Sequence, residues 1–313
     1  MRVAITGASG FVGVPTLAAA RAAGHEVVPL SRSGEGPRVD LGEPRGLAEA
    51  LRGCDAVVHL AAAMTGPDLE AANARMTEHL LAAMRAAEVP CLVLMSSLSV
   101  LDVAALSAGA TVDDAVPRAA SDAGLGPYAR AKRAQEEAAE DWRRGDPRGE
   151  DGARVLFSLR AGLVYGPGRL APAHAGFGVG ERGLSVLHGG EVPVLHVDAA
   201  ADAALRALEA PRAREGAHLL VDDDLPTQTE YLRALASLGA LPGWSLPIPW
   251  RAFAMLAGAA RGATRLAGRQ GPETFRAGSV AARYRPLHFR NDAAKAALDW
   301  APGARFSATF RAS

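Results

Sequence analysis

The chain has 313 residues, of which 49% are hydrophobic, and 34 Lys and Arg residues balance 34 Asp and Glu residues. This length predicts one large α/β domain, or one domain with a smaller lobe attached. The balanced charge gives no sign of a nucleic-acid-binding or anionic-membrane-binding protein, so we expect a small-molecule substrate as the partner.

Cysteine usage and hydropathy predict a cytoplasmic protein. Cys54 and Cys91 adjoin apolar runs, and we expect both to be small buried hydrophobes in a reducing compartment, not a disulfide. The first residues enter a strand-like run without the basic region and cleavage site of a signal peptide. No stretch approaches the roughly 18 unbroken apolar residues that indicate a membrane helix.

Short apolar runs alternate with longer amphipathic stretches in the first half of the chain. This alternation predicts an α/β fold with a doubly wound parallel sheet, whose apolar strands are covered on both faces. The clearest helix spans 69–87, because Met76, Leu80 and Met84 recur every four residues. The expected strands are 2–6, 26–30, 56–60, 91–95 and 155–159, and the expected helices are 12–23, 47–52, 69–87 and 128–142.

The pattern changes after residue 166, where Pro and Gly become frequent. We expect a smaller lobe there, with helices at 230–238 and 253–266 that have no clear partner strands. Before it, the polar run 143–152 is expected to be an exposed loop. A last helix is expected at 291–300, capped by Asn291 or Asp292.

The first expected strand runs into a glycine-rich turn, TGASGFVG, at residues 6–13. Gly7, Gly10 and Gly13 recur every third residue, which suits a tight turn, a close approach to a pyrophosphate, and packing of the next helix. The N-terminus of that helix would offer unpaired N–H groups to the phosphates. A turn without a ligand is the alternative, but the strand before and the helix after favour a dinucleotide.

The end of the second expected strand bears on which nicotinamide cofactor binds. NAD sites place a carboxylate there, whereas this strand ends in Leu30-Ser31-Arg32-Ser33. Arg32 has the geometry to pair with a 2′-phosphate, which favours NADP, with NAD as the alternative. A solvated surface arginine is the other interpretation of Arg32.

Tyr128 and Lys132 form a YxxxK pair on one face of an expected helix. A nearby ammonium would lower the pKa of the phenol and suit Tyr128 to acid/base chemistry. A chance pair on a surface helix is the alternative. Upstream, a strand ends in Ser96-Ser97, and a hydroxyl there would stabilise charge on a substrate oxygen.

Together these motifs resemble the extended short-chain dehydrogenases/reductases, the NAD-dependent epimerase/dehydratase family. The resemblance covers nearly the whole chain. It rests on TGxxGxxG at 6–13, DxVxHLAA at 55–62, NxxxT at 73–77, RPxxVYGP at 160–167 with Ala161 for Pro, HVD at 196–198, and an LGWxP-like end at 291–302 with Asp299 for Gly.

The resemblance implies a Rossmann-type sheet with a smaller C-terminal substrate lobe. The NAD(P)-binding domain would span 1–165, with 191–222 returning to it, and the substrate lobe 166–313. The implied homodimer would form through the helices after Leu69 and around Tyr128. His59 and His196 are expected to be structural, and no metal site is expected.

The resemblance also assigns residues. Val100 selects Ser97 as the catalytic serine and leaves Ser96 as a local backbone cap, although Leu101 and Asp102 depart from the family's usual Tyr-Gly. Catalysis would use Ser97, Tyr128 and Lys132. The residues implied to bind the cofactor are Gly7, Gly10, Phe11, Val12, Gly13, Arg32, Asp40, Leu41, Leu60, Ala61, Ala62, Asn73, Tyr128 and Lys132.

Three functions remain open. The favoured one is an NADP-dependent reductase or dehydrogenase of a small apolar carbonyl or alcohol compound, because the stretch 241–256 is apolar and aromatic. Plain lobe core is the alternative for that stretch. A nucleotide-sugar epimerase with tightly bound NAD would use the same catalytic groups, with Arg169, Arg182 and Arg206 as candidate diphosphate ligands. A dinucleotide-sensing protein without turnover is the third, and a dehydratase is disfavoured by Leu98-Ser99.

Overall fold

The computed structural model describes most of the chain. The described residues are 1–32, 35–122, 124–145, 154–167, 169–171, 176–179, 182–241, 244–266, 268, 280, 283–303 and 305–310. Within these residues, none of the helices combines the length and apolar character that a membrane crossing requires.

A six-stranded sheet in the order β2-β1-β3-β4-β6-β11 forms the centre of the molecule. Every strand pair in it is parallel. The order reverses beside β1, since β2 lies on one side of it and β3 on the other. The strands are β1 Arg2–Thr6, β2 Glu26–Leu30, β3 Ala56–His59, β4 Cys91–Ser97, β6 Val155–Ala161 and β11 Gly216–Leu220.

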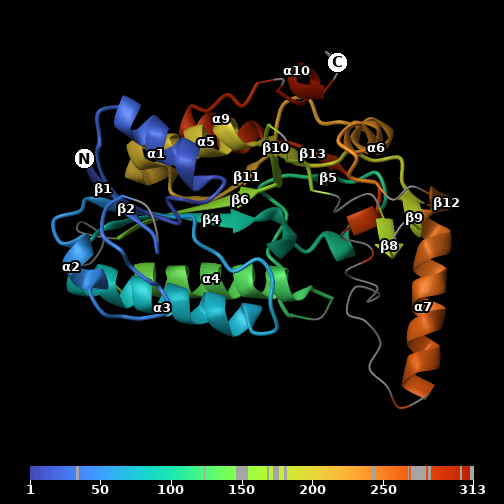
Figure 1. Cartoon of the computed structure of the whole chain (residues 1–313), viewed down its shortest axis with the longest axis horizontal. Coiled ribbons are helices and arrows are strands. Elements are labelled where there is room, and N and C mark those ends of the chain that lie inside the picture. The colour runs from blue at the N-terminus through green and yellow to red at the C-terminus, as the bar shows by residue number, and fades with distance from the viewer. Residues whose placement is uncertain are drawn as a thin grey trace.

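Helices cover both faces of this sheet (Figure 1). One layer holds α1 (Gly13–Ala22), α5 (Val197–Glu209) and α9 (Asp292–Leu298). The other holds α3 (Leu69–Ala86) and α4 (Pro127–Arg144), with the short α2 (Leu47–Leu51) beside them. The doubly wound α/β fold expected from the sequence is therefore confirmed.

The strands explain why both faces need a cover. In β1, Val3 and Ile5 join the core under α1 and α5, whereas Ala4 between them joins the core under α3 and α4. β4 alternates in the same way, with Val93 on the first side and Leu92 on the second. Because neighbouring side chains of a strand point to opposite faces, an unbroken apolar run supplies both cores.

Segments from the second half of the chain complete the sheet. β11 pairs with β6 at the sheet edge, and α5 packs against α1. α9 packs against α5 and β11, and its Leu298 joins the core on that side. Trp300 is buried there too, and its indole N–H donates to the Ala199 carbonyl at 3.1 Å.

Smaller sheets lie beyond the carboxyl ends of the central strands (Figure 1). One pairs β7 with β10, one pairs β5 with β13, and a three-stranded sheet runs β12-β9-β8. Their bounds are β5 Thr111–Val112, β7 Leu163–Tyr165, β8 Gly176–Val179, β9 Arg182–Leu187, β10 Val194–His196, β12 Trp244–Pro249 and β13 His288–Phe289. The helices here are α6 (Gln228–Ser237), α7 (Trp250–Leu266) and α10 (Arg305–Phe310).

Several element boundaries differ from the expectations. Strand β5 and the strands from β7 to β13 were not among those expected, and α7 packs against β9 and β12. The expected loop at 143–152 begins later, because Arg143 and Arg144 belong to α4, and 146–152 lie outside the described residues. Asn291 precedes α9 but does not cap it with its side chain, which donates to the Val221 carbonyl at 2.8 Å.

Candidate functional site

The glycine-rich turn joins β1 to α1 at the carboxyl end of the sheet. Gly7 has φ +67°, and a Cβ there would lie 2.9 Å from the backbone nitrogen of Ala61. A Cβ on Gly13 would lie only 2.0 Å from the Gly7 carbonyl oxygen. Both positions therefore require glycine, one for its backbone conformation and both for close packing. The Gly10 N–H donates to the Gly7 carbonyl at 2.8 Å and closes the turn.

The start of α1 suits an anion. Val12 occupies the N-cap position and provides no side-chain cap, and the first helical turn carries no acidic residue. The N-terminal amides of a helix present partial positive charge, so phosphates are favoured ligands at such an end. The turn therefore fits the pyrophosphate of a dinucleotide, with Gly10, Phe11, Val12 and Gly13 as its wall.

The loop after β3 lies against this turn. The backbone N–H groups of Leu60 and Ala61 donate to the Thr6 hydroxyl at 3.2 and 3.3 Å. The buried Asn73 of α3 fixes the same loop, since its amide exchanges hydrogen bonds with both backbone groups of Ala63 at 3.0 and 2.9 Å. Asn73 thus holds the loop that contains the expected cofactor residues Leu60, Ala61 and Ala62.

His59 is a structural group in this arrangement. Its Nδ1 lies 2.8 Å from the Thr6 hydroxyl, which already accepts two backbone N–H groups and therefore donates to Nδ1. Burial, together with a smaller effect of the charge on Lys132, lowers the pKa of His59 to about 3. The imidazole is neutral at physiological pH, which matches the structural role expected of it.

The residues expected at the adenosine end lie beside β2. Arg32 follows β2 and is exposed, and Ser31 pairs with Arg38 across an isolated bridge. The Asp40 carboxylate accepts the Gly42 N–H at 2.8 Å and so orders its own turn. Leu41 is buried in the core under α3 and α4. Ser33, next to Arg32, lies outside the described residues.

Ser97 and Tyr128 meet where β4 ends. Ser97 is the last residue of β4, and its hydroxyl accepts the Ser99 N–H at 3.2 Å and the Ser99 hydroxyl at 2.9 Å. Tyr128 lies in the first turn of α4. Burial raises the pKa of Tyr128, a hydrogen bond with Ser97 opposes that rise in part, and the resulting pKa is about 12.

Lys132 is buried one helical turn after Tyr128. Its ammonium donates to the Met95 carbonyl at 2.8 Å, near the end of β4. Burial lowers the pKa of Lys132, the charge of Glu136 opposes that shift in part, and the resulting pKa is about 8. The expected lowering of the Tyr128 pKa by Lys132 is not found, because burial dominates and Ser97 supplies the opposing hydrogen bond.

Glu136 was not expected, although it lies four residues after Lys132 on the same helical face. Its carboxylate is fully buried and accepts the Ser96 hydroxyl at 2.6 Å and two hydrogen bonds from Arg160 at 3.1 and 2.9 Å. Arg118 adds a contact at 3.3 Å. Glu136 therefore ties α4 to β4 and β6 directly behind Ser97 and Lys132.

The roles of the two serines differ from the expectation in one respect. Ser96 is not a local backbone cap, because its hydroxyl is taken by the Glu136 carboxylate. Ser97 instead caps the 3₁₀ turn Leu98–Val100 through its bond with Ser99. Both hydroxyls are therefore fixed, and only Ser97 contacts Tyr128.

His196, like His59, has a local structural contact. It is the N-cap of α5, and its Nδ1 accepts the Asp198 N–H at 3.2 Å. Its ring packs edge-on against Tyr165, with centroids 5.2 Å apart. Both contacts lie within the segment from β7 to α5, so His196 fits the structural role expected of it.

Comparison with known proteins shows the family of the chain. The sequence profile of the NAD dependent epimerase/dehydratase family matches residues 3–221, which is more than half of the chain. The chain belongs to this family. The match includes the glycine-rich turn, the end of β4, and the Tyr128–Lys132 pair, so the extended short-chain dehydrogenase/reductase resemblance is confirmed. A comparison with curated protein sequences found no match.

Several solved structures share this fold. MoeE5 in complex with UDP-glucose and NAD is 23% identical, with TM-score 0.66, covering 96% of this chain and 93% of its own. A short-chain dehydrogenase/reductase superfamily protein of Agrobacterium tumefaciens with bound NAD is 20% identical, with TM-score 0.70, covering 100% and 95%. The UDP-glucose 4-epimerase of Thermus thermophilus in complex with NAD is 25% identical, with TM-score 0.60, covering 80% and 86%.

Membership of this family supports a nicotinamide dinucleotide as the cofactor of the protein. The turn residues fit that group, since a tight glycine turn ends in a helix start without a side-chain cap. The ends of β1 and β3 lie beside each other where the strand order reverses, which is where open α/β sheets bind their ligands.

Proposed function

We propose that the protein is an oxidoreductase that transfers hydride between a nicotinamide dinucleotide and a carbonyl or alcohol carbon of a small substrate. The convergence of Ser97, Tyr128 and Lys132 at the carboxyl end of β4 carries this proposal. Such a constellation holds an acid/base group beside a hydroxyl donor and a cation, as hydride transfer to a carbonyl requires.

Each residue has a separate role in this mechanism. Tyr128 donates a proton to the substrate oxygen during reduction, and burial keeps its pKa near 12, so it is protonated at neutral pH. Ser97 donates a hydrogen bond to the same oxygen and stabilises the developing charge. Lys132, held by the Met95 carbonyl, supplies positive charge behind Tyr128. The dinucleotide supplies the hydride when bound.

The proposed cofactor is NADP, and Arg32 is the residue that supports it. No carboxylate follows β2 at Ser31-Arg32, and Arg32 is exposed and in no ion pair with the other described residues. Arg32→Ala should weaken NADPH binding about tenfold to a hundredfold, because a charge-assisted phosphate contact is lost. NADH binding should change less than about twofold. Fluorescence titration of both cofactors measures this.

A remote arginine provides the control for Arg32. Arg52 is an exposed arginine paired with Glu49 at 2.8 Å on the surface of α2 and its C-cap. Arg52→Ala should leave both affinities unchanged. Equal losses of NADPH and NADH affinity in Arg32→Ala would show that Arg32 does not read the 2′-phosphate.

A reductase of an apolar compound is our first candidate. Of the candidate diphosphate ligands, Arg206 is instead paired with Asp202 and Asp299 at 3.5 and 3.6 Å on the surface of α5. The side chain of Arg182 lies outside the described residues. The apolar stretch 241–256 is only partly lobe core. Phe253 packs in that core, whereas Leu246 and Met255 are exposed.

A nucleotide-sugar epimerase is an equally serious second candidate. The Thermus thermophilus structure, at 25% identity, is a UDP-glucose 4-epimerase in complex with NAD. The MoeE5 structure holds both NAD and the nucleotide sugar UDP-glucose. The same Ser97, Tyr128 and Lys132 would serve such a reaction. A dinucleotide-sensing protein without turnover is the third candidate, disfavoured because Tyr128 and Lys132 are both present.

One experiment separates these candidates. The absorption spectrum of the protein as purified shows whether a dinucleotide is retained, and titration with NADPH and NADH then measures preference. An empty protein that prefers NADPH supports the reductase, and a carbonyl panel follows. Retained, non-exchanging NAD(H) contradicts the reductase proposal and directs the next assay to nucleotide sugars. Dinucleotide binding without turnover of any carbonyl or sugar substrate supports the sensing protein.

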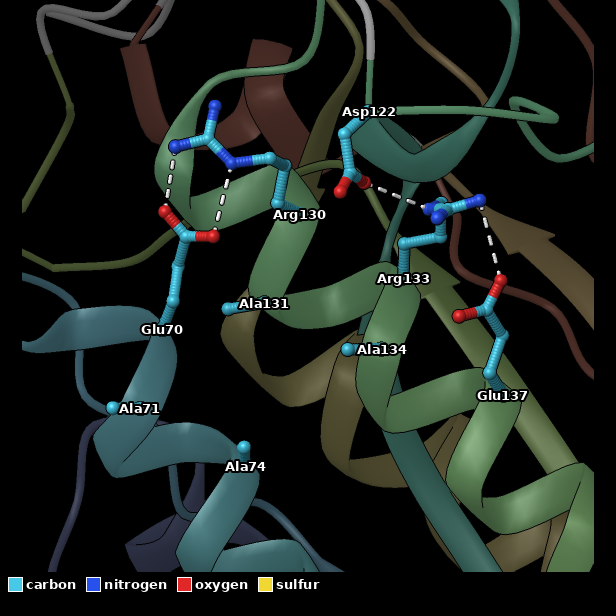
Figure 2. A pocket seen from close by; sticks show the side chains of 9 residues that line it. All are labelled: Glu70, Ala71, Ala74, Asp122, Arg130, Ala131, Arg133, Ala134 and Glu137. Carbon is cyan, nitrogen blue, oxygen red and sulfur yellow. Dashed lines mark hydrogen bonds and ion pairs between the residues drawn. The ribbon is translucent and has the colours of Figure 1, made fainter.

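We also propose a homodimer formed through α3 and α4. A groove between these helices is lined by Ala71 and Ala74 of α3 and by Ala131 and Ala134 of α4 (Figure 2). Charged pairs border it, among them Glu70–Arg130 at 2.6 Å. Small side chains between charged pairs allow the helices of a second copy to approach closely.

Light scattering of the purified protein tests this dimer. The wild-type protein should have the mass of a dimer. Ala134→Glu should reduce it to a monomer, because a larger charged side chain enters the groove from the exposed position 134. Ala293→Glu, at an exposed position of α9, is the matched control and should remain dimeric. A monomeric wild-type protein contradicts the proposal.

A further inference from the structure

Arg169 lies beside the glycine-rich turn, over the ring of Phe11, although it follows β7 and is far from that turn in sequence. Its guanidinium carbon is 4.4 Å from the centroid of the Phe11 ring. The backbone beneath it is fixed, because Gly166 and Arg169 exchange N–H···O hydrogen bonds in both directions, at 3.1 and 2.9 Å. A tight turn thus holds this arginine beside the glycine-rich turn.

The Phe11 ring packs directly on the backbone of this second turn. A Cβ on Gly166 would lie 3.0 Å from the ring carbon Cζ of Phe11 and 2.8 Å from a methyl group of Val197. Only glycine fits there without a shift of the ring or of α5. The contact between the two turns is therefore built into the backbone and not limited to the arginine side chain.

The charge of Arg169 is not neutralised within the described residues. The side chain is exposed, and it forms no ion pair with a described carboxylate. Contact with an aromatic face uses the plane of the guanidinium and leaves its N–H groups available as donors. An available fork of donors beside helix-start amides suits a doubly charged diphosphate.

We propose that Arg169 is a ligand of the pyrophosphate of the bound nicotinamide dinucleotide, placed by its contact with Phe11. The proposal rests on dinucleotide binding alone, which the reductase and epimerase candidates share. A substrate diphosphate has the same chemistry, but Phe11 belongs to the glycine-rich turn, and this favours the cofactor as the source. Arg169 would then connect the segment after β7 with the cofactor.

Binding of ADP-ribose tests this role apart from activity and from NADP preference. ADP-ribose keeps the pyrophosphate but lacks both nicotinamide and a 2′-phosphate. By calorimetry, Arg169→Ala should bind it about tenfold more weakly than the wild-type protein. The difference should shrink as salt is raised, because a partly exposed ionic contact is screened. UDP, as a probe for the substrate site, should bind both proteins equally.

Arg251 supplies a matched control. It also lies over an aromatic ring, 5.9 Å from the Trp250 centroid, but on α7 at the far end of the lobe (Figure 1). Arg251→Ala should bind ADP-ribose like the wild-type protein. Unchanged ADP-ribose affinity in Arg169→Ala would overturn the proposal, as would a loss confined to UDP. A wild-type protein that binds no ADP-ribose would overturn it too, whatever the NADPH titration shows.

Discussion

Tyr128→Phe should lower kcat by a factor of about 10² to 10⁴, because the variant lacks the hydroxyl proposed to transfer the substrate proton. The change removes one oxygen and keeps the ring, which preserves the packing of the first turn of α4. Steady-state assays with the best substrate of a carbonyl or nucleotide-sugar panel measure the loss. Dinucleotide affinity should stay within about threefold, since the proposed phosphate site is the glycine-rich turn after β1 and not the start of α4.

A second tyrosine distinguishes loss of chemistry from loss of structure. Tyr231 of α6 is fully buried, and its hydroxyl donates to the Ala171 carbonyl in the lobe. Tyr231→Phe should reduce stability by about 1 to 3 kcal/mol while kcat changes little, because only a buried hydrogen bond is lost. If Tyr128→Phe retained wild-type kcat, the acid/base assignment would be wrong.

The central sheet was predictable because its signals are local. Each parallel strand is a short apolar run, and a helix separates it from the next strand of the sheet along the chain, so alternation alone predicts the doubly wound fold. The start of α6 was also readable, since Thr227 and Glu230 form a capping box that places the helix start at Gln228. The expected start at 230 overlooked that signal.

The lobe could not be predicted in the same way. β12 reads WSLPIP, in which two prolines oppose a strand assignment, and it forms because β9 lies beside it. β5 and β13 have two residues each and pair although more than half of the length of the chain separates them. Contacts of this kind depend on tertiary placement, and neither periodicity nor composition reports them.

The candidate site was also predictable only in part. Ser97, Tyr128 and Lys132 lie within recognisable motifs, and the structure brings Ser97 and Tyr128 into contact. The placement of Arg169 over Phe11 joins two turns that no motif connects. Glu136 had a usable signal, because a carboxylate on the buried face of an amphipathic helix requires a partner, but the sequence does not say which arginine supplies it.

Glu136→Ala should destabilise the protein by about 3 to 5 kcal/mol, among the largest losses for any single change. The substitution leaves the guanidinium of Arg160 buried without its carboxylate and removes the acceptor of the Ser96 hydroxyl. Urea unfolding measures the change in the free energy of unfolding. Glu140→Ala is the control, because Glu140 is partly exposed and pairs only with Arg118 among these groups. Glu140→Ala should lower the free energy of unfolding by only about 1 kcal/mol.

Glu136→Gln separates the electrostatic effect of Glu136 from its structural one. The amide keeps the size of the side chain but removes the negative charge that raises the pKa of Lys132. With that charge gone, burial should lower the pKa of Lys132 further below about 8, so Lys132 loses its proton at lower pH. If protonated Lys132 supports catalysis, the alkaline limb of the kcat profile moves to lower pH in Glu136→Gln and stays in place in Glu140→Gln. A purely structural Glu136 would lower the whole profile without moving that limb.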